Sequence, residues 1–221
     1  MLMIPVLKRV IITGGTGGLG QCISQRFITA GWQVLALGRE DLDLTCPSAI
    51  EAFFSANPCD LLVCAAGAIC DQPLMKMNES IWDEILDINY LAAKRCALAA
   101  IASMMDKNQG HVVFISSYAA FHPVAGQAAY ATAKAALLGL TSDLAFEHGS
   151  NQIRVNAILP GFMDTRMTEN VSSERKHEVR KSHVMGQFNT PAIVADFIWF
   201  LEERMPHTSG QIFQLDSRPS F

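Results

Sequence analysis

Short apolar runs rich in β-branched residues alternate along this chain with longer stretches of helical periodicity. The runs lie at 10–12, 34–37, 61–63 and 112–115; an alternating segment at 153–159 and a short segment at 211–215 are two further predicted strands, and the helical stretches lie at 19–30, 47–54, 80–105, 126–147 and 190–204. Apolar runs of this length are typical of buried parallel strands. Their alternation with helices predicts an α/β fold, a doubly wound parallel sheet with helices on both faces.

Length and composition narrow the class of protein. The chain has 221 residues, 50% of them hydrophobic, and no linker or repeat divides it, so we expect one domain over 1–221. A net charge of −4 offers no basic field for nucleic acid. No apolar run is long enough to span a membrane, and the six cysteines form no C-x-x-C pair. We expect a cytoplasmic protein with reduced thiols and no metal site.

Several unusual segments directly follow the predicted strands. They are the glycine-rich turn at 13–20, Arg39, the Ala65-Ala66-Gly67 segment, Ser117 and the Pro160-Gly161 pair. Right-handed crossovers place the carboxyl ends of parallel strands along one edge of the sheet, where ligands of such folds bind. These segments are therefore expected to meet at a single site.

The glycine-rich turn is the candidate phosphate site. Gly14, Gly18 and Gly20 follow the spacing G-x-x-x-G-x-G, with Thr16 and Leu19 between them, before an amphipathic helix. Such glycines permit a tight turn and the close approach of a pyrophosphate to the start of a helix. A plain strand-to-helix turn is the alternative, because a glycine-rich turn alone is weak evidence.

Tyr130 and Lys134 are candidates for acid–base chemistry. They lie four residues apart in a predicted helix, so they share one face, and Ser117 lies thirteen residues upstream of Tyr130. A phenol beside an ammonium group is a plausible acid for protonating a carbonyl oxygen. The alternatives are an amphipathic surface pair for Tyr130 and Lys134, and a turn-forming role for Ser117.

Taken together, six separated motifs resemble those of the short-chain dehydrogenase/reductase family. They are Thr13-Gly14-x-x-x-Gly18-x-Gly20, Ala65-Ala66-Gly67, Asn89, Ser117, Tyr130-x-x-x-Lys134 and Pro160-Gly161, and the resemblance runs from Val10 to about Asp216. It implies a Rossmann-like fold that binds a nicotinamide dinucleotide.

The resemblance also implies catalytic roles. Tyr130 would be the acid/base, and Ser117 would hydrogen-bond the substrate oxygen that Tyr130 protonates. Lys134 would hold the nicotinamide ribose and, with an oxidised cofactor, lower the Tyr130 pKa from about 10 to about 7, which requires about 4 kcal/mol. Asn89 would hold a water that connects Lys134 to solvent.

Further cofactor contacts follow from the same resemblance. The backbone of Met163 would meet the nicotinamide carboxamide, and the Thr165 hydroxyl would bind the carboxamide or a phosphate. Asp43 would accept from the adenine amino group, with the Leu44 backbone alongside, although Asp43 could equally be an acidic residue that leads into a helix. The remaining expected contacts come from Ala65, Ala66, Gly67, Tyr130, Lys134, Pro160 and Gly161.

The choice between the two nicotinamide dinucleotides rests on the end of the second predicted strand. Arg39 stands there, where an acidic residue would bind the adenosine ribose and repel a 2′-phosphate. A guanidinium can bind that phosphate, so NADP(H) is favoured over NAD(H). Glu40 and Asp41 follow at once and count against this preference.

Two segments depart from the family pattern, the one after Arg39 and the C-terminal one, whereas the segment 167–187 between them follows it. Only three residues separate Arg39 from Asp43, where the family has a whole crossover helix, so either the third strand is vestigial or that sheet edge is rebuilt. The segment 167–187 is expected to form a lid over the substrate. At the C-terminus, Leu215-Asp216-Ser217-Arg218 replaces the family's common Asp-Gly-Gly.

The leading functional hypothesis is an NADP-dependent oxidoreductase that interconverts a small carbonyl compound and its alcohol. A 3-oxoacyl-thioester ketoreductase, acting on acyl-carrier-protein or CoA substrates, is the alternative, although Phe146 stands where its carrier-binding arginine is usual. A non-catalytic regulatory protein that binds the nucleotide is the third hypothesis. The alanine-rich helices at 80–105 and 126–147 suggest a homodimer or homotetramer.

Overall fold

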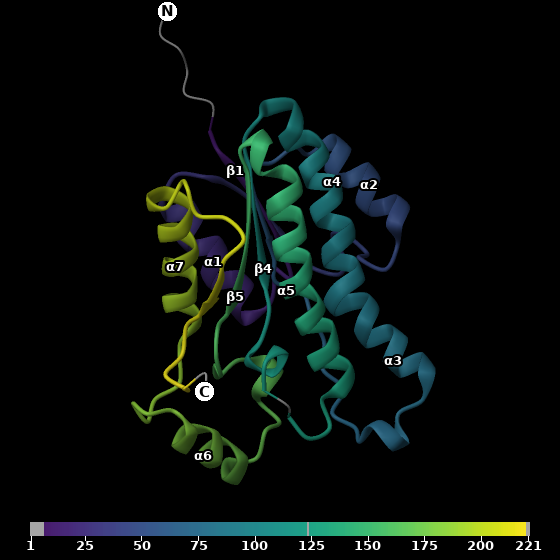
Figure 1. Ribbon diagram of the computed structural model, residues 1–221, viewed down its shortest axis with the longest axis vertical. Coiled ribbons are helices and arrows are strands. Elements are labelled where there is room, and N and C mark those ends of the chain that lie inside the picture. Colours follow the sequence, from purple (N-terminus) through teal and green to yellow (C-terminus); the bar gives the residue numbers. More distant parts are fainter. Residues whose placement is uncertain (1–6, 123, 220–221) are drawn as a thin grey trace, which may run out of the picture.

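The computed structural model describes residues 7–122 and 124–219. Its centre is one sheet of six parallel strands in the order β2-β1-β3-β4-β5-β6 (Figure 1). The strands are β1 (Arg9–Thr13), β2 (Gln33–Leu37), β3 (Leu61–Cys64), β4 (Gly110–Ile115), β5 (Ile153–Leu159) and β6 (Ile212–Gln214). The predicted parallel sheet is confirmed.

Helices cover both faces of this sheet. α1 (Gly18–Thr29) and α7 (Pro191–Arg204) lie on one face, and α2 (Pro47–Ala56), α4 (Ala92–Lys107) and α5 (Ala128–His148) lie on the other (Figure 1). α3 (Glu79–Leu86) continues the line of α4, and α6 (Ser173–Ser182) lies beyond the carboxyl edge of the sheet. The fold is therefore doubly wound, as the sequence predicts.

Alternate strand residues supply the two halves of the core. Val10 and Ile12 of β1 pack with α1 and α7, whereas Ile11 between them packs with α2, α4 and α5. All three side chains are fully buried. Because side chains of a strand point alternately to opposite faces, an unbroken apolar run is what a sheet covered on both sides requires.

The shortened segment after Arg39 changes the edge of the sheet. β2 is the edge strand, and no strand of the described residues pairs with its outer side. The chain leaves β2 through a turn in which Asp41 accepts a hydrogen bond from the Gly38 backbone at 2.8 Å, and it then enters α2 and crosses to β3. The switch in strand order falls between β1 and β3, where a ligand crevice is expected.

The helical stretch predicted for 80–105 contains a break that the sequence does not signal. α3 and α4 are joined by a π-helical turn over Asp87–Leu91. Within it Asn89 is fully buried, and its side-chain nitrogen donates to the backbone oxygen of Ile85 at 2.9 Å. A side chain that bonds to the preceding turn disturbs the regular ladder, and π turns of this kind are frequent at functional sites.

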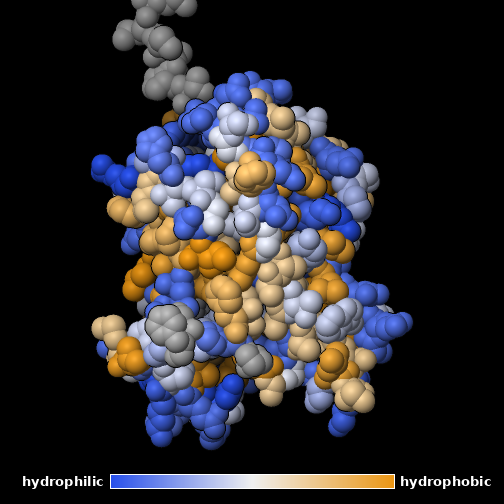
Figure 2. Space-filling model, in the orientation of Figure 1, coloured by the Kyte–Doolittle hydropathy of each residue, from blue (hydrophilic) through white to orange (hydrophobic). Residues whose placement is uncertain are grey.

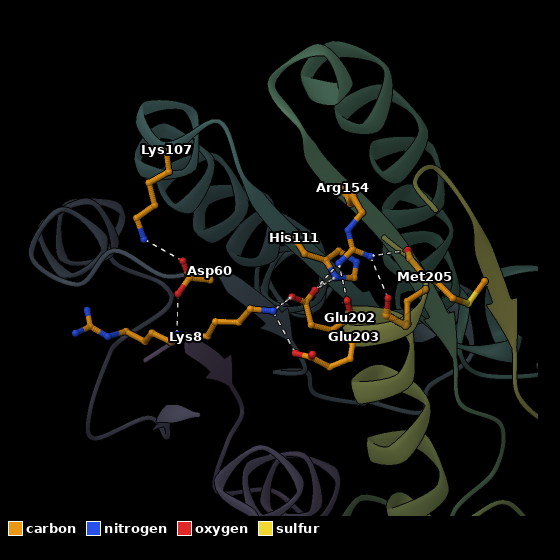
Figure 3. Close-up of polar contacts among 10 residues, drawn as sticks. Lys8, Asp60, Lys107, His111, Arg154, Glu202, Glu203 and Met205 are labelled. Carbon is orange, nitrogen blue, oxygen red and sulfur yellow. Dashed lines mark hydrogen bonds and ion pairs between the residues drawn. The ribbon is translucent and has the colours of Figure 1, made fainter. Parts of the chain in front are cut away.

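A buried ionic cluster joins the opposite, amino-terminal edge of the sheet to α7 (Figure 3). His111 of β4 lies with its Nδ1 2.9 Å from Oε2 of Glu202, and Arg154 of β5 contacts the same carboxylate. Arg154 also donates to the backbone oxygens of Leu201 and Met205, which belong to the last turn of α7 and its C-cap. The guanidinium therefore satisfies carbonyls that the helix end leaves unpaired.

None of the helices in the described residues combines the length and the apolarity needed to cross a membrane.

Candidate active site

The glycine-rich turn leaves the start of α1 open to an anion. Gly17 is the N-cap residue and has no side chain to accept from the first backbone amides, and the first turn of α1 holds no acidic residue. Thr16, Gly17 and Gly18 are exposed. Free amides and the positive end of a helix suit a phosphate, so these residues fit the pyrophosphate of a dinucleotide.

The glycine-rich turn needs glycine at several positions, because neighbouring backbone segments pack closely against it. Gly14 has a φ of +68°, and a Cβ there would lie 2.7 Å from the backbone nitrogen of Ala66. A Cβ on Gly20 would lie 2.2 Å from the oxygen of Gly14, and one on Gly18 would lie 3.3 Å from the methyl carbon of Thr165. The turn, the segment after β3 and the segment after β5 therefore meet, as predicted. Leu19, by contrast, is half-buried and packs into the apolar core.

Ser117, Tyr130 and Lys134 are also brought together. Ser117 follows β4, and its side chain lies close enough to that of Tyr130 in α5 to affect the Tyr130 pKa. The Lys134 Nζ lies 5.6 Å from the centroid of the Tyr130 ring and donates to the backbone oxygen of Ile115 at 2.9 Å. Tyr130 and Lys134 are only 9% and 4% exposed. The amphipathic surface pair is therefore the wrong interpretation of these two residues.

Burial sets the protonation of this pair. Desolvation raises the pKa of Tyr130, and the hydrogen bond from Ser117 opposes this only in part. Desolvation also lowers the pKa of Lys134 to about 8. The expectation of a lowered Tyr130 pKa applies to the protein with an oxidised cofactor and stays a prediction; the Lys134 Nζ lies over the Tyr130 ring and bonds to the Ile115 carbonyl.

Asn89 holds the segment that follows β3. Its Nδ2 donates to the oxygen of Ala68 at 2.8 Å, and its Oδ1 accepts from the Ala68 nitrogen at 3.3 Å. A Cβ on Gly67 would lie 2.7 Å from this Oδ1 and 3.5 Å from the Lys134 Nζ, so Gly67 stands between the two side chains. The water relay through Asn89 stays a prediction.

The segment after β5 is fixed by residues that sequence reasoning did not single out. Gly161 takes a φ of +83°, which favours glycine. Asn189 donates to the oxygen of Pro160 at 2.8 Å, and the Thr168 hydroxyl donates to the oxygen of Met163 at 2.7 Å. No sequence motif marks these supports, because both act across a loop on backbone atoms.

The adenine side of the site is more open. Arg39 is exposed directly after β2. Asp43 is exposed, and its Oδ1 accepts from the nitrogen and hydroxyl of Thr45 at 2.9 and 2.7 Å, which lowers its pKa. This bonding gives Asp43 a local role at the entry to α2. Leu44 packs against the core, so only its backbone is free for the expected contact.

The segment 167–187, the predicted lid, contains α6, whose side chains are exposed or half-buried. Lys176 of α6 is paired with Asp164 at 3.0 Å, which ties the helix to the segment after β5. A pocket of about 360 Å³ lies next to this contact and is lined by Asp164, Arg180, Phe188 and the start of α7. Phe162 and Phe188 pack together at 4.5 Å between ring centroids.

A serine–tyrosine–lysine set at the carboxyl edge of a doubly wound sheet, beside an uncapped helix start, is the arrangement expected of a nicotinamide-dependent oxidoreductase. Comparison with known proteins agrees. Residues 45–176 match the family of short chain dehydrogenases. The chain belongs to the short-chain dehydrogenase/reductase family, and it is an enzyme of the NAD(P)-dependent dehydrogenase/reductase type.

Two relatives are 3-oxoacyl-[acyl-carrier-protein] reductases named FabG. The protein of Vibrio cholerae is 30% identical, over 88% of this chain and 89% of the relative. That of Chlamydia muridarum is also 30% identical, over 96% of each chain. Both alignments span almost the whole catalytic fold.

Solved structures show the same architecture. An oxidoreductase of the short-chain family from Burkholderia thailandensis superposes with a TM-score of 0.88 at 27% identity, covering 96% of this chain and 92% of the other. A putative NAD(P) dependent gluconate 5-dehydrogenase from Beutenbergia cavernae, with bound NADP, superposes with a TM-score of 0.91 at 27% identity, covering 95% of each.

Proposed function

We propose that this protein, as one catalytic domain over residues 1–221, is an NADP-dependent reductase of small carbonyl compounds that also oxidises the corresponding alcohols. The observation that carries the proposal is the burial of Tyr130 and Lys134 side by side, with the Ser117 side chain next to the phenol. A raised Tyr130 pKa keeps the phenol protonated at neutral pH, which is the state that a proton donor to a carbonyl oxygen needs.

Each residue of the set has a distinct task. Tyr130 gives its proton to the carbonyl oxygen as negative charge develops there, and the Ser117 hydroxyl donates to the same oxygen. Lys134 holds a positive charge next to the phenol below its pKa of about 8, so the phenolate left after proton transfer is stabilised. Asn89 supports the backbone at 67–68 beside Lys134 and completes proton supply through solvent.

The cofactor lies, in this proposal, along the carboxyl edge of the sheet. Its pyrophosphate is held by the amides at the start of α1, with Gly14, Gly18 and Thr165 around it, and its nicotinamide end by Lys134 and the segment after Pro160. When bound, the nicotinamide supplies or accepts the hydride. Support comes from the uncapped helix start and from the NADP-bound relative from Beutenbergia cavernae.

Arg39 is proposed to select NADP(H) by binding the 2′-phosphate. Its exposure at the end of β2 supports this role, whereas the carboxylate of Asp41, folded back onto Gly38, is the competing feature. Arg39→Ala is expected to lower kcat/KM for NADPH by about tenfold and to leave that for NADH within twofold. If Asp41 instead binds the ribose, the wild type prefers NADH and Asp41→Ala abolishes that preference.

The central experiment follows the nicotinamide absorbance while NADPH is consumed by a panel of small ketones and aldehydes. We expect turnover that Tyr130→Phe lowers by at least about a thousandfold while the affinity for NADPH stays within twofold. The Tyr118→Phe protein serves as a matched control for the loss of one phenolic hydroxyl. Equal activity of the Tyr130→Phe and wild-type proteins would refute the assignment of the proton donor.

A 3-oxoacyl-thioester reductase is the second candidate, because the relatives from Vibrio cholerae and Chlamydia muridarum carry that name. The fully exposed Phe146 counts against docking of an acidic carrier protein at this point of α5. Comparing kcat/KM for a 3-oxoacyl CoA thioester with that for a free ketone of equal chain length decides between the two. A protein that binds NADPH and reduces neither would be a nucleotide-binding regulator.

A further inference from the structure

The segment after β6 returns to the catalytic serine. The guanidinium carbon of Arg218 lies 3.5 Å from the centroid of the Tyr118 ring, and Tyr118 is the residue that follows Ser117. The ring of His122 is stacked on Tyr118 at 4.1 Å with 19° between the planes. Two groups so close to one ring centroid cannot share a face, so Arg218 and His122 enclose the Tyr118 ring from opposite sides.

Arg218 is held in this position by a buried carboxylate. Its Nε donates to Oδ2 of Asp216 at 2.6 Å, and its backbone nitrogen donates to Oδ1 at 3.1 Å. Gln214 donates to the same Oδ1 at 2.8 Å. The side chain of Asp216 is fully buried and that of Arg218 is 9% exposed. A buried, multiply bonded pair of this kind fixes its geometry closely.

The same carboxylate reaches the lid. Nε2 of His183, the residue directly after α6, is fully buried and lies 3.7 Å from Oδ2 of Asp216. The backbone nitrogen of Val184 donates to the oxygen of Ser217 at 3.1 Å. Asp216 also packs on the turn after β5, because a Cβ on Gly161 would lie 2.6 Å from that of Asp216. The short segment 216–218 therefore contacts the loop that carries Ser117 (the serine loop), the end of the predicted lid, and the turn after β5.

Resting on the proposed function, we propose that Arg218 is a positioning residue for the reaction. Through the Tyr118 ring it orients Ser117, and through Asp216 it fastens the end of α6 to the serine loop. The substrate carbonyl is then held between Ser117 and Tyr130 by a loop that cannot swing away. Misplacement of a catalytic group by a fraction of an ångström lowers the rate of the chemical step more than it weakens binding.

The test compares Arg218→Ala and Arg218→Lys with Arg204→Ala, which removes an exposed arginine at the end of α7. Four quantities are measured: kcat, KM for the carbonyl substrate, Kd for NADPH, and the rate at which trypsin cleaves α6. That helix offers four sites, Arg175, Lys176, Arg180 and Lys181. Trypsin digestion needs no substrate, so it reports on the lid even if the proposed reaction is wrong.

We expect Arg218→Ala to lower kcat by about tenfold, to change the NADPH Kd by less than twofold and to speed cleavage in α6 at least threefold. Arg218→Lys keeps the charge opposite Asp216 but not the flat contact with Tyr118, so it should restore the protection of α6 but not the full kcat. If the Arg218→Ala protein does not fold, the Arg218→Lys protein is measured in its place.

Three results would overturn the proposal. In the first, kcat and α6 cleavage stay within twofold of wild type. In the second, kcat and NADPH affinity fall together, which would show general loosening instead of positioning. In the third, Arg204→Ala matches Arg218→Ala. If the wild type binds NADPH but reduces no carbonyl compound, the proposed function fails, and the cleavage rates alone decide whether Arg218 fastens the lid.

Discussion

The Nζ of Lys134 donates a hydrogen bond to the backbone oxygen of Ile115 at 2.9 Å, which joins α5 to the last residue of β4 inside the protein. In return, the Ser116 hydroxyl donates to the backbone oxygen of Lys134 at 2.8 Å. These two bonds fix the lysine beside Tyr130 before any ligand arrives. They also place a cation where water cannot solvate it, and this has measurable consequences.

The first consequence concerns stability. Burial lowers the Lys134 pKa from 10.5 to about 8, which corresponds to about 3 kcal/mol at pH 7, since one pKa unit is worth about 1.4 kcal/mol. Losing the bond to Ile115 costs about 1 kcal/mol. We therefore expect Lys134→Met to abolish activity and to raise the free energy of unfolding by about 2 kcal/mol at pH 7, a cost of function often found at active sites.

Urea unfolding measures this, with Lys181→Met as a control that removes an exposed lysine. Because the folded state binds the Lys134 proton more weakly than the unfolded chain does, the wild type gains stability between about pH 8 and pH 10.5. The difference in free energy of unfolding between Lys134→Met and the wild type should therefore decrease between these two pH values. A variant less stable than wild type at pH 7 would contradict the argument.

The second consequence concerns the pH dependence of reduction. Tyr130 keeps its proton at neutral pH because its pKa is raised, whereas Lys134 loses its charge above a pKa of about 8. We expect kcat/KM for reduction to be flat between pH 6 and pH 7.5 and to fall about tenfold per unit above pH 8, since this ratio reports the free enzyme. A profile that stays level to pH 10 would exclude Lys134 as the titrating group.

The ionic cluster at the far edge of the sheet predicts loss of stability in acid. Burial lowers the pKa of His111 below its ordinary 6.5. Burial alone would raise the pKa of Glu202, but the hydrogen bond from His111 and the charges of Arg154 and Lys8 outweigh it, so the Glu202 pKa lies below 4.5. Both groups bind protons more weakly when folded, so stability should fall as the pH drops below about 6.5 and fall further below 4.5.

Glu202→Gln tests this cluster, because it leaves Arg154 buried without a counter-charge. We expect it to lower the free energy of unfolding by about 3 kcal/mol at pH 7 and to flatten the dependence on pH below 4.5. Glu203→Gln is the matched control, since Glu203 makes an exposed pair with Lys8 at 3.2 Å, and its loss should cost less than about 0.5 kcal/mol. Equal losses of free energy of unfolding in the two variants would refute the role of Glu202 as the buried counter-charge of Arg154.

An apolar surface predicts assembly. Leu98 and Met105 of α4 and Phe146 of α5 are 44%, 43% and 91% exposed. Hydrophobic and weakly polar side chains gather over these two helices on the face shown in Figure 2. Because single domains seldom leave such a surface uncovered, we expect a homodimer or homotetramer through α4 and α5.

Light scattering at micromolar concentration measures the mass. Phe146→Asp should yield a smaller species, whereas Met75→Asp should not, although Met75 is equally exposed at 96%. A monomeric wild type would end this prediction.

Local sequence patterns determine the strands of this protein and the two halves of its candidate site. The apolar run at 10–12 and its counterparts predict buried parallel strands. A sheet covered by helices on both faces buries every side chain of such a strand, so both of the strand's faces must be apolar. The spacing of Gly14, Gly18 and Gly20 and the interval between Tyr130 and Lys134 predict the two halves of the site, since helix and turn geometry acts over a few residues. The sequence also shows that the segment after Arg39 is too short for another crossover.

Tertiary structure decided what depends on burial and on contacts distant in sequence. The Tyr130 pKa is raised because the fold desolvates the phenol, and the Lys134 Nζ bonds to the backbone of Ile115; the spacing of the two residues predicts neither. The contact of Arg218 with Tyr118 joins positions 100 residues apart. Residues so distant in sequence carry no local signal of their meeting, because packing of the whole chain brings them together.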